Sequence, residues 1–387
     1  ASVIYQCFKS GVKSVWLAPT EILARQHYLK LKSLFANENI NIGLLTSKES
    51  LIEGRVKKLS LINWLKNGYL DITVGTHALL QDNINIKKLG LVIVDEQHRF
   101  GVKQRYKLKN ISSDNSRIPH FLSMTATPIP RSLALTIFGD LDVSRITELP
   151  KNRLPIITQI VKDDDKSHIY KRIDTELALG HQIYIITPLV EKSNNEDDER
   201  LFDLDSKKAA KEEFEVIKKK YPKNKVGLLY GKMKSLEKSK IMDDFNSGII
   251  EILVSTSVVE VGVDVKNATV IVIEGAENFG LSQLHQFRGR VGRSDIQSFC
   301  YAICQSKNPI SVKRMKIFSE NNDGFKLAEK DLQMRGYGDL GGLRQSGAMK
   351  LKIARLSDKI LIKTAKEVAK EMIRSKSLDK KIIDTYK

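Results

Sequence analysis

The fold is constrained most by a repeated alternation of short apolar runs with longer amphipathic stretches. Runs such as Leu91-Val92-Ile93-Val94 are apolar on both faces, as expected of a strand that helices cover on each side. The stretches between the runs, for example 21–35 and 54–67, have helical spacing. This alternation is typical of βα units and a parallel sheet. The strands predicted in the first part are 14–18, 42–45, 72–75, 91–94 and 121–124.

The series restarts after a proline-containing break at residues 148–156. The second set of predicted strands is 182–187, 225–229, 252–255, 270–273 and 299–303. The charged segment 191–215 is interpreted as a solvated loop that runs into a helix. From Asn308 onward the pattern is helical, with glycines inside a basic stretch. The sequence therefore predicts two consecutive α/β domains with parallel sheets, 1–149 and 150–308, followed by a helical tail, 309–387.

Composition argues against a disordered chain, a disulfide-rich protein and a membrane-spanning protein. Hydrophobic residues make up 41% of the chain, which is enough for buried cores. The three cysteines cannot form a disulfide framework, so we expect a reducing compartment, the cytoplasm. No apolar run approaches the roughly 20 residues that a transmembrane helix needs, and we expect no membrane partner.

The net charge of +18 points to a polyanionic partner, although a lysine-rich surface from biased codon usage explains it equally well. Residues 1–150 carry +8, residues 151–310 carry +1 and residues 311–387 carry +9. The excess is therefore concentrated at the two ends, and charge alone does not identify the partner.

A pair of carboxylates, Asp95 and Glu96, directly follows the apolar run 91–94. Open α/β sheets place their ligands at the carboxyl ends of strands. Phosphoryl transfer to water needs one carboxylate to hold Mg²⁺ and another group to orient the attacking water, and these two residues could divide the roles. The alternative is a solvated strand end, which the pair alone does not exclude.

A second signal is the segment Gln286-Phe287-Arg288-Gly289-Arg290-Val291-Gly292-Arg293. Arg290 and Arg293 are three residues apart, which in a helix places them on one face. The glycines beside them remove side-chain bulk and would let a ligand approach. Guanidinium groups presented in this way suit the negative charge of a transferred phosphoryl group. A nonspecific phosphate-binding patch is the alternative.

Other residues give weaker signals. Hydroxyl residues end two predicted strands, at Thr125-Ala126-Thr127 and at Ser255-Thr256-Ser257, and both are compatible with ordinary turn chemistry. Cys300 and Cys304 have no zinc-type partners and are interpreted as buried thiols. The histidines His27, His168 and His181 show no partner pattern, and we expect them in the core or at the surface. We expect Trp16 and Trp64 in the core; the alternative is that they stack on bases.

The order of these motifs is more specific than any one of them. The series is 18–21, 75–77, 95–98, 125–127, 256–264 and 286–293. It resembles the motif series of superfamily 2 helicases and translocases, whose two RecA-like lobes bind ATP in the cleft between them. Finer matches at 95–102, 124–131 and 280–293 resemble the RecG family of branch-migrating DNA helicases. The tail at 322–347 resembles that family's translocation motif, and Gln97 favours RecG over the transcription-repair coupling factor.

The resemblance implies ATP and Mg²⁺ as cofactors. Asp95 would hold Mg²⁺ through ATP, and Glu96 would position the hydrolytic water. The arginines Arg290 and Arg293 would reach the γ-phosphate, with Gln286 nearby. Residues expected to couple nucleotide state to lobe movement or to contact nucleotide are His98, Thr125, Ala126, Thr127, Gly262 and Asp264.

The resemblance also implies contacts with the backbone of branched double-stranded DNA, such as replication forks and Holliday junctions. In the two lobes the expected contacts are Pro19, Thr20, Arg25, Thr76, His77 and Thr256. In the tail they are Arg335, Arg344 and Gln345, within a helical hairpin that converts lobe closure into duplex movement. Single-strand-binding protein or other repair factors are the protein partners to consider.

The chain departs from the family pattern at its start. No Gly-x-x-x-x-Gly-Lys-Thr/Ser phosphate-binding loop occurs in it, and residue 1 falls within the helix that such a loop would open. The family's wedge domain is also missing. We therefore expect an incomplete first lobe, and a chain that alone does not hydrolyse ATP. The alternatives left open are a transcription-repair coupling translocase and a catalytically inactive nucleic-acid-binding fragment; an RNA helicase is less favoured.

Overall fold

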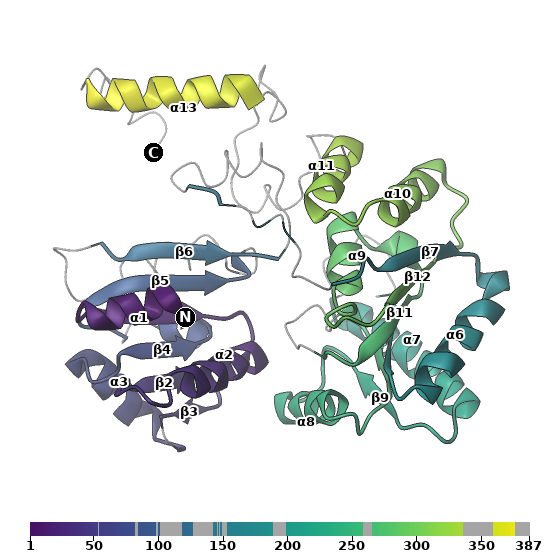
Figure 1. Cartoon of the computed structure of the whole chain (residues 1–387), viewed down its shortest axis with the longest axis horizontal. Coiled ribbons are helices and arrows are strands. Elements are labelled where there is room, and N and C mark those ends of the chain that lie inside the picture. Colours follow the sequence, from purple (N-terminus) through teal and green to yellow (C-terminus); the bar gives the residue numbers. More distant parts are fainter. Residues whose placement is uncertain are drawn as a thin grey trace.

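The computed structural model describes residues 1–52, 54–81, 84–97, 100, 118–126, 142–144, 146, 148, 153–188, 199–257, 265–335 and 359–375. These residues form two six-stranded sheets, each with helices on both faces, followed by further helices (Figure 1). We call the two sheets with their helices lobe 1 and lobe 2. Both have the α/β architecture of RecA-like lobes, as the sequence predicted.

The sheet of lobe 1 has the strand order β3-β2-β4-β1-β5-β6 and is parallel except for β3, which pairs antiparallel with β2. β1 lies between β4 and β5, so that Leu17 is in register with both Gly75 and Val94. The strands are β1 (Lys13–Leu17), β2 (Ile42–Leu45), β3 (Ser50–Leu51), β4 (Ile72–Gly75), β5 (Leu89–Asp95) and β6 (His120–Met124).

Helices cover both faces of this sheet. The apolar side chains of α1 (Ser2–Lys9) and α2 (Glu21–Leu34) pack on one face, and those of α3 (Lys58–Asn67) pack on the other. The end of β4 requires glycine, because a Cβ on Gly75 would collide with the carbonyl oxygen of Leu45. This close approach keeps the ends of β2 and β4 side by side.

The sheet of lobe 2 is entirely parallel, with the order β7-β12-β11-β8-β10-β9. On one face pack α6 (Ser167–Ala178) and α7 (Glu199–Lys220); on the other pack α8 (Ser235–Asn246) and α9 (Leu281–Arg288). The strands are β7 (Ile157–Val161), β8 (Gln182–Ile186), β9 (Val226–Leu229), β10 (Ile252–Ser255), β11 (Ala268–Ile273) and β12 (Phe299–Ile303).

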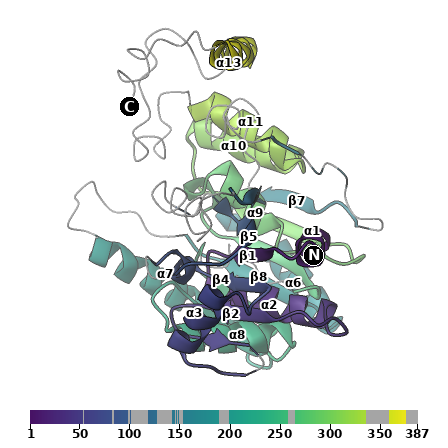
Figure 2. The same cartoon turned by 90° about the vertical axis from the view of Figure 1, so that its left-hand side faces the viewer.

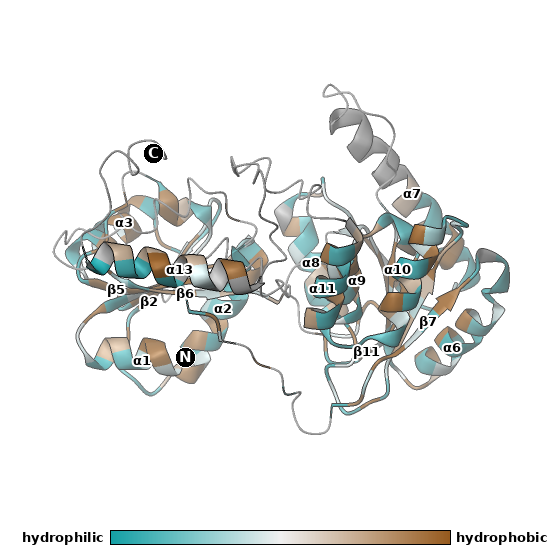
Figure 3. Cartoon of the chain, turned by 90° about the horizontal axis from the view of Figure 1, so that it is seen from above, coloured by the Kyte–Doolittle hydropathy of each residue, from teal (hydrophilic) through white to brown (hydrophobic). Residues whose placement is uncertain are grey.

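In the described part of the chain after lobe 2 there are three helices. The helices α10 (Pro309–Glu320) and α11 (Gly324–Arg335) lie beside α9 and contribute Met315, Phe318 and Leu327 to the same apolar cluster (Figures 1 and 2). The third, α13 (Lys359–Arg374), carries both hydrophilic and hydrophobic residues, and Leu361 and Val368 on it are exposed (Figure 3). Among the described residues, no helix is long and apolar enough to span a membrane.

All ten predicted strands are present, and the residues that the structure describes form two further strands that were not predicted, β3 and β7. The short β3 has only two residues. β7 lies at the edge of its sheet, where Ile157 and Ile160 are exposed by 44% and 38%. An edge strand with exposed apolar side chains lacks the buried apolar run used to find the other strands.

Candidate functional site

The candidate residues of lobe 1 gather at one edge of its sheet, because the carboxyl ends of parallel strands meet there. β1 is followed by Pro19 and Thr20, and β4 by Thr76 and His77. The next two strands along the sheet carry the carboxylates and the hydroxyl segment. These are Asp95 and Glu96 at the end of β5, and Thr125 and Ala126 after β6.

Glu96 ties the ends of β5 and β6 together. Its φ of +49° is in the left-handed region, which is uncommon for a residue with a side chain. Its Oε2 accepts hydrogen bonds from the Thr125 hydroxyl at 3.1 Å and from the Ala126 amide at 3.4 Å. Next to it, the buried Gln97 accepts a hydrogen bond from Ser123. The hydroxyl segment therefore touches the catalytic candidate directly.

Asp95 has a partner that the sequence did not predict. The Nε2 of His27 lies 3.1 Å from Oδ2 of Asp95, and each side chain is 20% exposed. His27 is on α2, which starts directly after β1, the strand that neighbours β5. The partner is 68 residues away in sequence, so it emerges only once the strand order is known.

The carboxylates of Asp95 and Glu96 fit a magnesium ion that a nucleotide brings with it. Carboxylate oxygens are the ligands that Mg²⁺ prefers, and it usually takes one or two of them together with substrate phosphates. Among the residues that the structure describes, no group of three or more potential ligands could hold a metal ion alone.

The DNA-contact candidates of lobe 1 differ in accessibility. Thr20 caps α2, accepting a hydrogen bond from the Leu23 amide at 3.4 Å, and Arg25 is exposed on the first turns of that helix. Thr76 is only 1% exposed, whereas the neighbouring His77 is exposed, with Nε2 3.5 Å from the Ser47 hydroxyl. At this strand end the accessible side chain is thus that of His77.

In lobe 2 the two candidate arginines do not share a helical face, and this expectation was wrong. α9 ends at Arg288, and the chain continues as a turn that we call the arginine turn, residues 289–293. Gly292 has a φ of +68°, and a Cβ there would lie 2.8 Å from Ile156. A helix cannot continue through this residue, so its glycine serves the turn and its packing.

The arginine turn is held by its neighbours. Arg290 is buried, and Nε of Arg293 donates to the carbonyl oxygen of Gly289 at 3.0 Å. Arg153, which precedes β7, donates from Nε to the carbonyl oxygen of Gly292 at 2.6 Å. The start of lobe 2 and the turn near its end are therefore bonded to each other.

Arg288 connects the arginine turn to the tail. Its buried guanidinium donates to the carbonyl oxygens of Phe318 (3.0 Å) and Asn321 (2.8 Å) at the end of α10. It also donates to Nδ1 of His285 at 3.0 Å. Burial, reinforced by the charge of Arg288, lowers the pKa of His285 to about 4, so the imidazole is neutral at pH 7 and can accept this bond. Arg288 thus fixes α10 to α9.

Replacing Arg288 with methionine is expected to lower the free energy of unfolding by about 2–4 kcal/mol, because buried carbonyl oxygens lose charged donors. Arg172 is the matched control. It is 38% exposed and contacts Glu176 at 3.6 Å and the Phe299 ring, so Arg172→Met should cost about 1 kcal/mol or less. Urea denaturation followed by circular dichroism measures both. Equal losses in the two variants would contradict the assignment.

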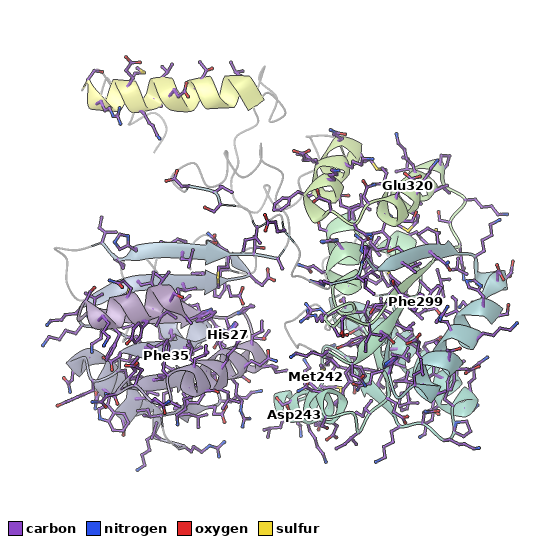
Figure 4. All side chains as sticks on the ribbon, viewed as in Figure 1. His27, Phe35, Met242, Asp243, Phe299 and Glu320 are labelled. Atoms are coloured by element: carbon purple, nitrogen blue, oxygen red, sulfur yellow. The ribbon has the colours of Figure 1, made fainter. Side chains whose placement is uncertain are left out.

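The two lobes meet at the start of α2. Ile22 packs against the apolar cluster of lobe 2 that contains Met242, and Met233 packs there too. Figure 4 shows Met242 and Asp243 of α8 on the side of lobe 2 that is turned toward lobe 1. Lys238, also on α8, has its pKa lowered by burial and by the charge of Lys48 in lobe 1. Positive side chains of both lobes therefore approach one another here.

The remaining candidates are described in part. Thr256 follows β10 and is buried, with its amide bonded to the carbonyl oxygen of Leu229 at 3.1 Å. Gln286 is half-buried on α9, and Arg335 is the last residue of α11. Cys300 is buried, as expected, and burial raises its pKa to about 12, whereas Cys304 is only half-buried. The candidates that lie outside the described residues are His98, Thr127, Gly262, Asp264, Arg344 and Gln345.

Family models match three successive parts of the chain. The DEAD/DEAH box helicase model matches residues 2–136, and the helicase conserved C-terminal domain model matches residues 173–295. The model for ATP-dependent DNA helicase RecG, domain 3, C-terminal, matches residues 321–383. The last of these models covers the tail with the predicted translocation motif.

Similar proteins cover nearly the whole chain. The ATP-dependent DNA helicases RecG of Bacillus subtilis and Aquifex aeolicus are 46% and 45% identical to it, over 97% and 95% of this chain. These matches cover 53% and 45% of the two relatives, so the chain spans about half their length.

Solved structures of helicases superpose on this chain. A structure of RecG bound to a three-way DNA junction superposes with a TM-score of 0.71 and 37% identity, over 93% of this chain and 45% of that one. The DNA-bound helicase MrfA superposes with a TM-score of 0.58 at 16% identity, over 82% of this chain and 46% of that one. The second likeness concerns the fold alone.

Proposed function

Because this chain belongs to the RecG family of DNA helicases over the part of that family's length that it spans, we propose that the protein is an ATP-driven translocase that remodels branched double-stranded DNA. The observation that carries the proposal is the combination of three parts in one chain. These are a carboxylate pair at the end of β5, the arginine turn on the opposite lobe and a tail that matches a RecG-specific model. Its place of action would be the bacterial cytoplasm.

We assign the nucleotide chemistry to the carboxylate pair. Magnesium bound with ATP would neutralise charge on the phosphates during transfer to water. Asp95 would hold that ion, and Glu96 would orient the attacking water. Thr125 and Ala126, which bond the Glu96 carboxylate, would sense its position when nucleotide binds. His98, Thr127, Gly262 and Asp264 are proposed to join this coupling.

From the second lobe, Arg290 and Arg293 would stabilise the negative charge that develops on the γ-phosphate, with Gln286 beside them. The turn geometry supports Arg293 as the residue that reaches the nucleotide. Arg290 is 8% exposed, whereas Arg293 is only half-buried, and its side-chain Nε donates to the carbonyl oxygen of Gly289. In this assignment Arg290 mainly shapes the turn.

DNA would be bound through its phosphates, which position a motor without reading sequence. In the lobes the proposed contacts are Pro19, Thr20, Arg25 and His77. Thr76 and Thr256 were also expected to contact DNA, but they are 1% and 2% exposed and do not present their side chains to it. In the tail, Arg335, Arg344 and Gln345 would move the duplex. The RecG-specific match there favours this function over a transcription-repair coupling translocase.

The test is ATP hydrolysis by the full-length protein with four nucleic acids of equal length: a three-way junction, linear duplex, single-stranded DNA and RNA. We expect the junction to stimulate hydrolysis at least about tenfold over RNA, and the protein to convert the junction to its reannealed products. Equal stimulation by RNA and the junction would contradict the proposal. Hydrolysis with no conversion of the junction would also contradict it.

A further inference from the structure

His27, to which no role has yet been assigned, contacts Asp95 at the edge of the lobe 1 sheet where the carboxyl ends of the strands meet. α2 starts at the end of β1, and its second turn lies over the end of β5 because those strands are neighbours. His27, labelled in Figure 4, thereby comes to Asp95, with 3.1 Å between Nε2 and Oδ2. A carboxylate oxygen can only accept, so the imidazole donates from Nε2.

The ring of His27 is itself held in place. It stacks on the indole of Trp16, with 4.3 Å between ring centroids and 22° between the planes. Trp16 is in the middle of β1 and pairs in register with Val74 and Ile93 of the neighbouring strands. The stacking on Trp16, a residue of the sheet, thus holds the His27 ring in the position from which Nε2 donates to Asp95.

Hydrogen bonds of this kind orient metal-binding carboxylates and histidines in many proteins. Loss of such an outer partner typically costs about 10–100-fold in metal affinity or activity. Asp95 needs such an orienting bond, because a single carboxylate at a strand end can rotate about its terminal bond. The other oxygen-bearing neighbour, Glu96, is directed toward Thr125 and Ala126.

We propose that His27 is a positioning residue that sets the Asp95 carboxylate for the magnesium ion of a bound nucleotide. This inference rests on the proposed function, in which Asp95 is the magnesium-holding residue. It adds a role for a residue that lies on the helix beginning at Thr20, a proposed DNA contact. His27 does not touch the nucleotide and acts only through Asp95.

Two variants of the full-length protein distinguish the two contributions of His27, which are the hydrogen bond to Asp95 and the stacking of its ring on Trp16. His27→Phe keeps a ring that can stack on Trp16 but removes the donor. His27→Gln loses the stack but retains an N–H at about the distance of Nε2. We expect His27→Phe to raise the Mg²⁺ concentration for half-maximal ATP hydrolysis at least about tenfold. His27→Gln should restore most of this loss.

A binding measurement gives a readout independent of activity. Calorimetry of ADP binding with and without Mg²⁺ reports how far magnesium strengthens nucleotide binding. In His27→Phe this strengthening should fall by the same factor as the magnesium dependence of hydrolysis, while ADP binding without Mg²⁺ is unchanged. His120→Phe is the control, because His120 is exposed at the start of β6, the end opposite to the site. It should match the wild type.

The outcomes separate this inference from the proposed function. If the wild type hydrolyses ATP but His27→Phe keeps the wild-type magnesium dependence, the inference alone is overturned. A lower melting temperature in His27→Phe with unchanged magnesium dependence also overturns it, since it would mean that His27 only stabilises the lobe. A wild type without magnesium-dependent hydrolysis overturns both.

Discussion

Replacing Glu96 with glutamine in the full-length protein is expected to reduce ATP turnover about 10²–10⁴-fold, because the group that orients or deprotonates the attacking water is lost. Nucleotide binding should be largely retained. Glutamine has nearly the same volume, and its amide oxygen can still accept the bonds from Thr125 and Ala126. Steady-state hydrolysis and binding of a fluorescent ATP analogue measure the two properties.

The control for this variant is Glu38→Gln, which removes an exposed carboxylate of the same lobe that accepts a hydrogen bond from Tyr5. It should hydrolyse ATP like the wild type. Undiminished hydrolysis in Glu96→Gln would refute the assignment of the carboxylate pair. A loss of nucleotide binding equal to the loss of turnover would refute the role of Glu96 in the chemical step.

Replacing Arg293 with alanine should slow hydrolysis by about 10³–10⁵-fold, the usual contribution of an arginine that stabilises a transferred phosphoryl group. Binding of a three-way junction should change little, because the residue is assigned to nucleotide and not to DNA. The variant loses the bond from Nε of Arg293 to Gly289, but the fold of the turn should survive. The Gly292 carbonyl oxygen still accepts from Arg153, and the Gly292 amide still donates to the Ser298 hydroxyl at 3.1 Å. Hydrolysis at saturating ATP and junction binding by anisotropy measure the two effects.

Two further variants sharpen this result. Arg293→Lys keeps the charge but not the planar fork, so it should recover only a small part of the rate. Arg172→Ala removes a partly exposed arginine of the same lobe on α6 and should hydrolyse ATP normally. A pure defect in junction binding in Arg293→Ala would identify the arginine turn as a phosphate patch for DNA.

The parallel strands could be predicted because burial on both faces leaves continuous apolar runs in the sequence. β11 is an example, with all six of its residues buried. β7 lacked that signal, because it is an edge strand and only Val161 among its residues is buried. Its position was decided instead by pairing with β12, which comes about 140 residues later.

The site was predictable where its chemistry is local and not where it depends on distant parts of the chain. Asp95 and Glu96 are adjacent in sequence, so their placement at a strand end followed from one apolar run. The contact of His27 with Asp95 depends on β1 and β5 being neighbours, which periodicity does not reveal. The expectation that Arg290 and Arg293 share a helical face was wrong because α9 ends at Arg288, and residue spacing does not reveal the left-handed conformation of Gly292 between them.

The bonds of Arg288 have a mechanical consequence. Two helices move together only if the contact between them is rigid. The Arg288 guanidinium, on α9, is bonded to two carbonyl oxygens at the end of α10 and restricts movement of one helix against the other. α9 and α10 would then move as one rigid unit, which is joined to the arginine turn at the end of α9. If a bound nucleotide tilts the arginine turn, α10 would tilt with it, because Arg288 holds the end of α10 to α9.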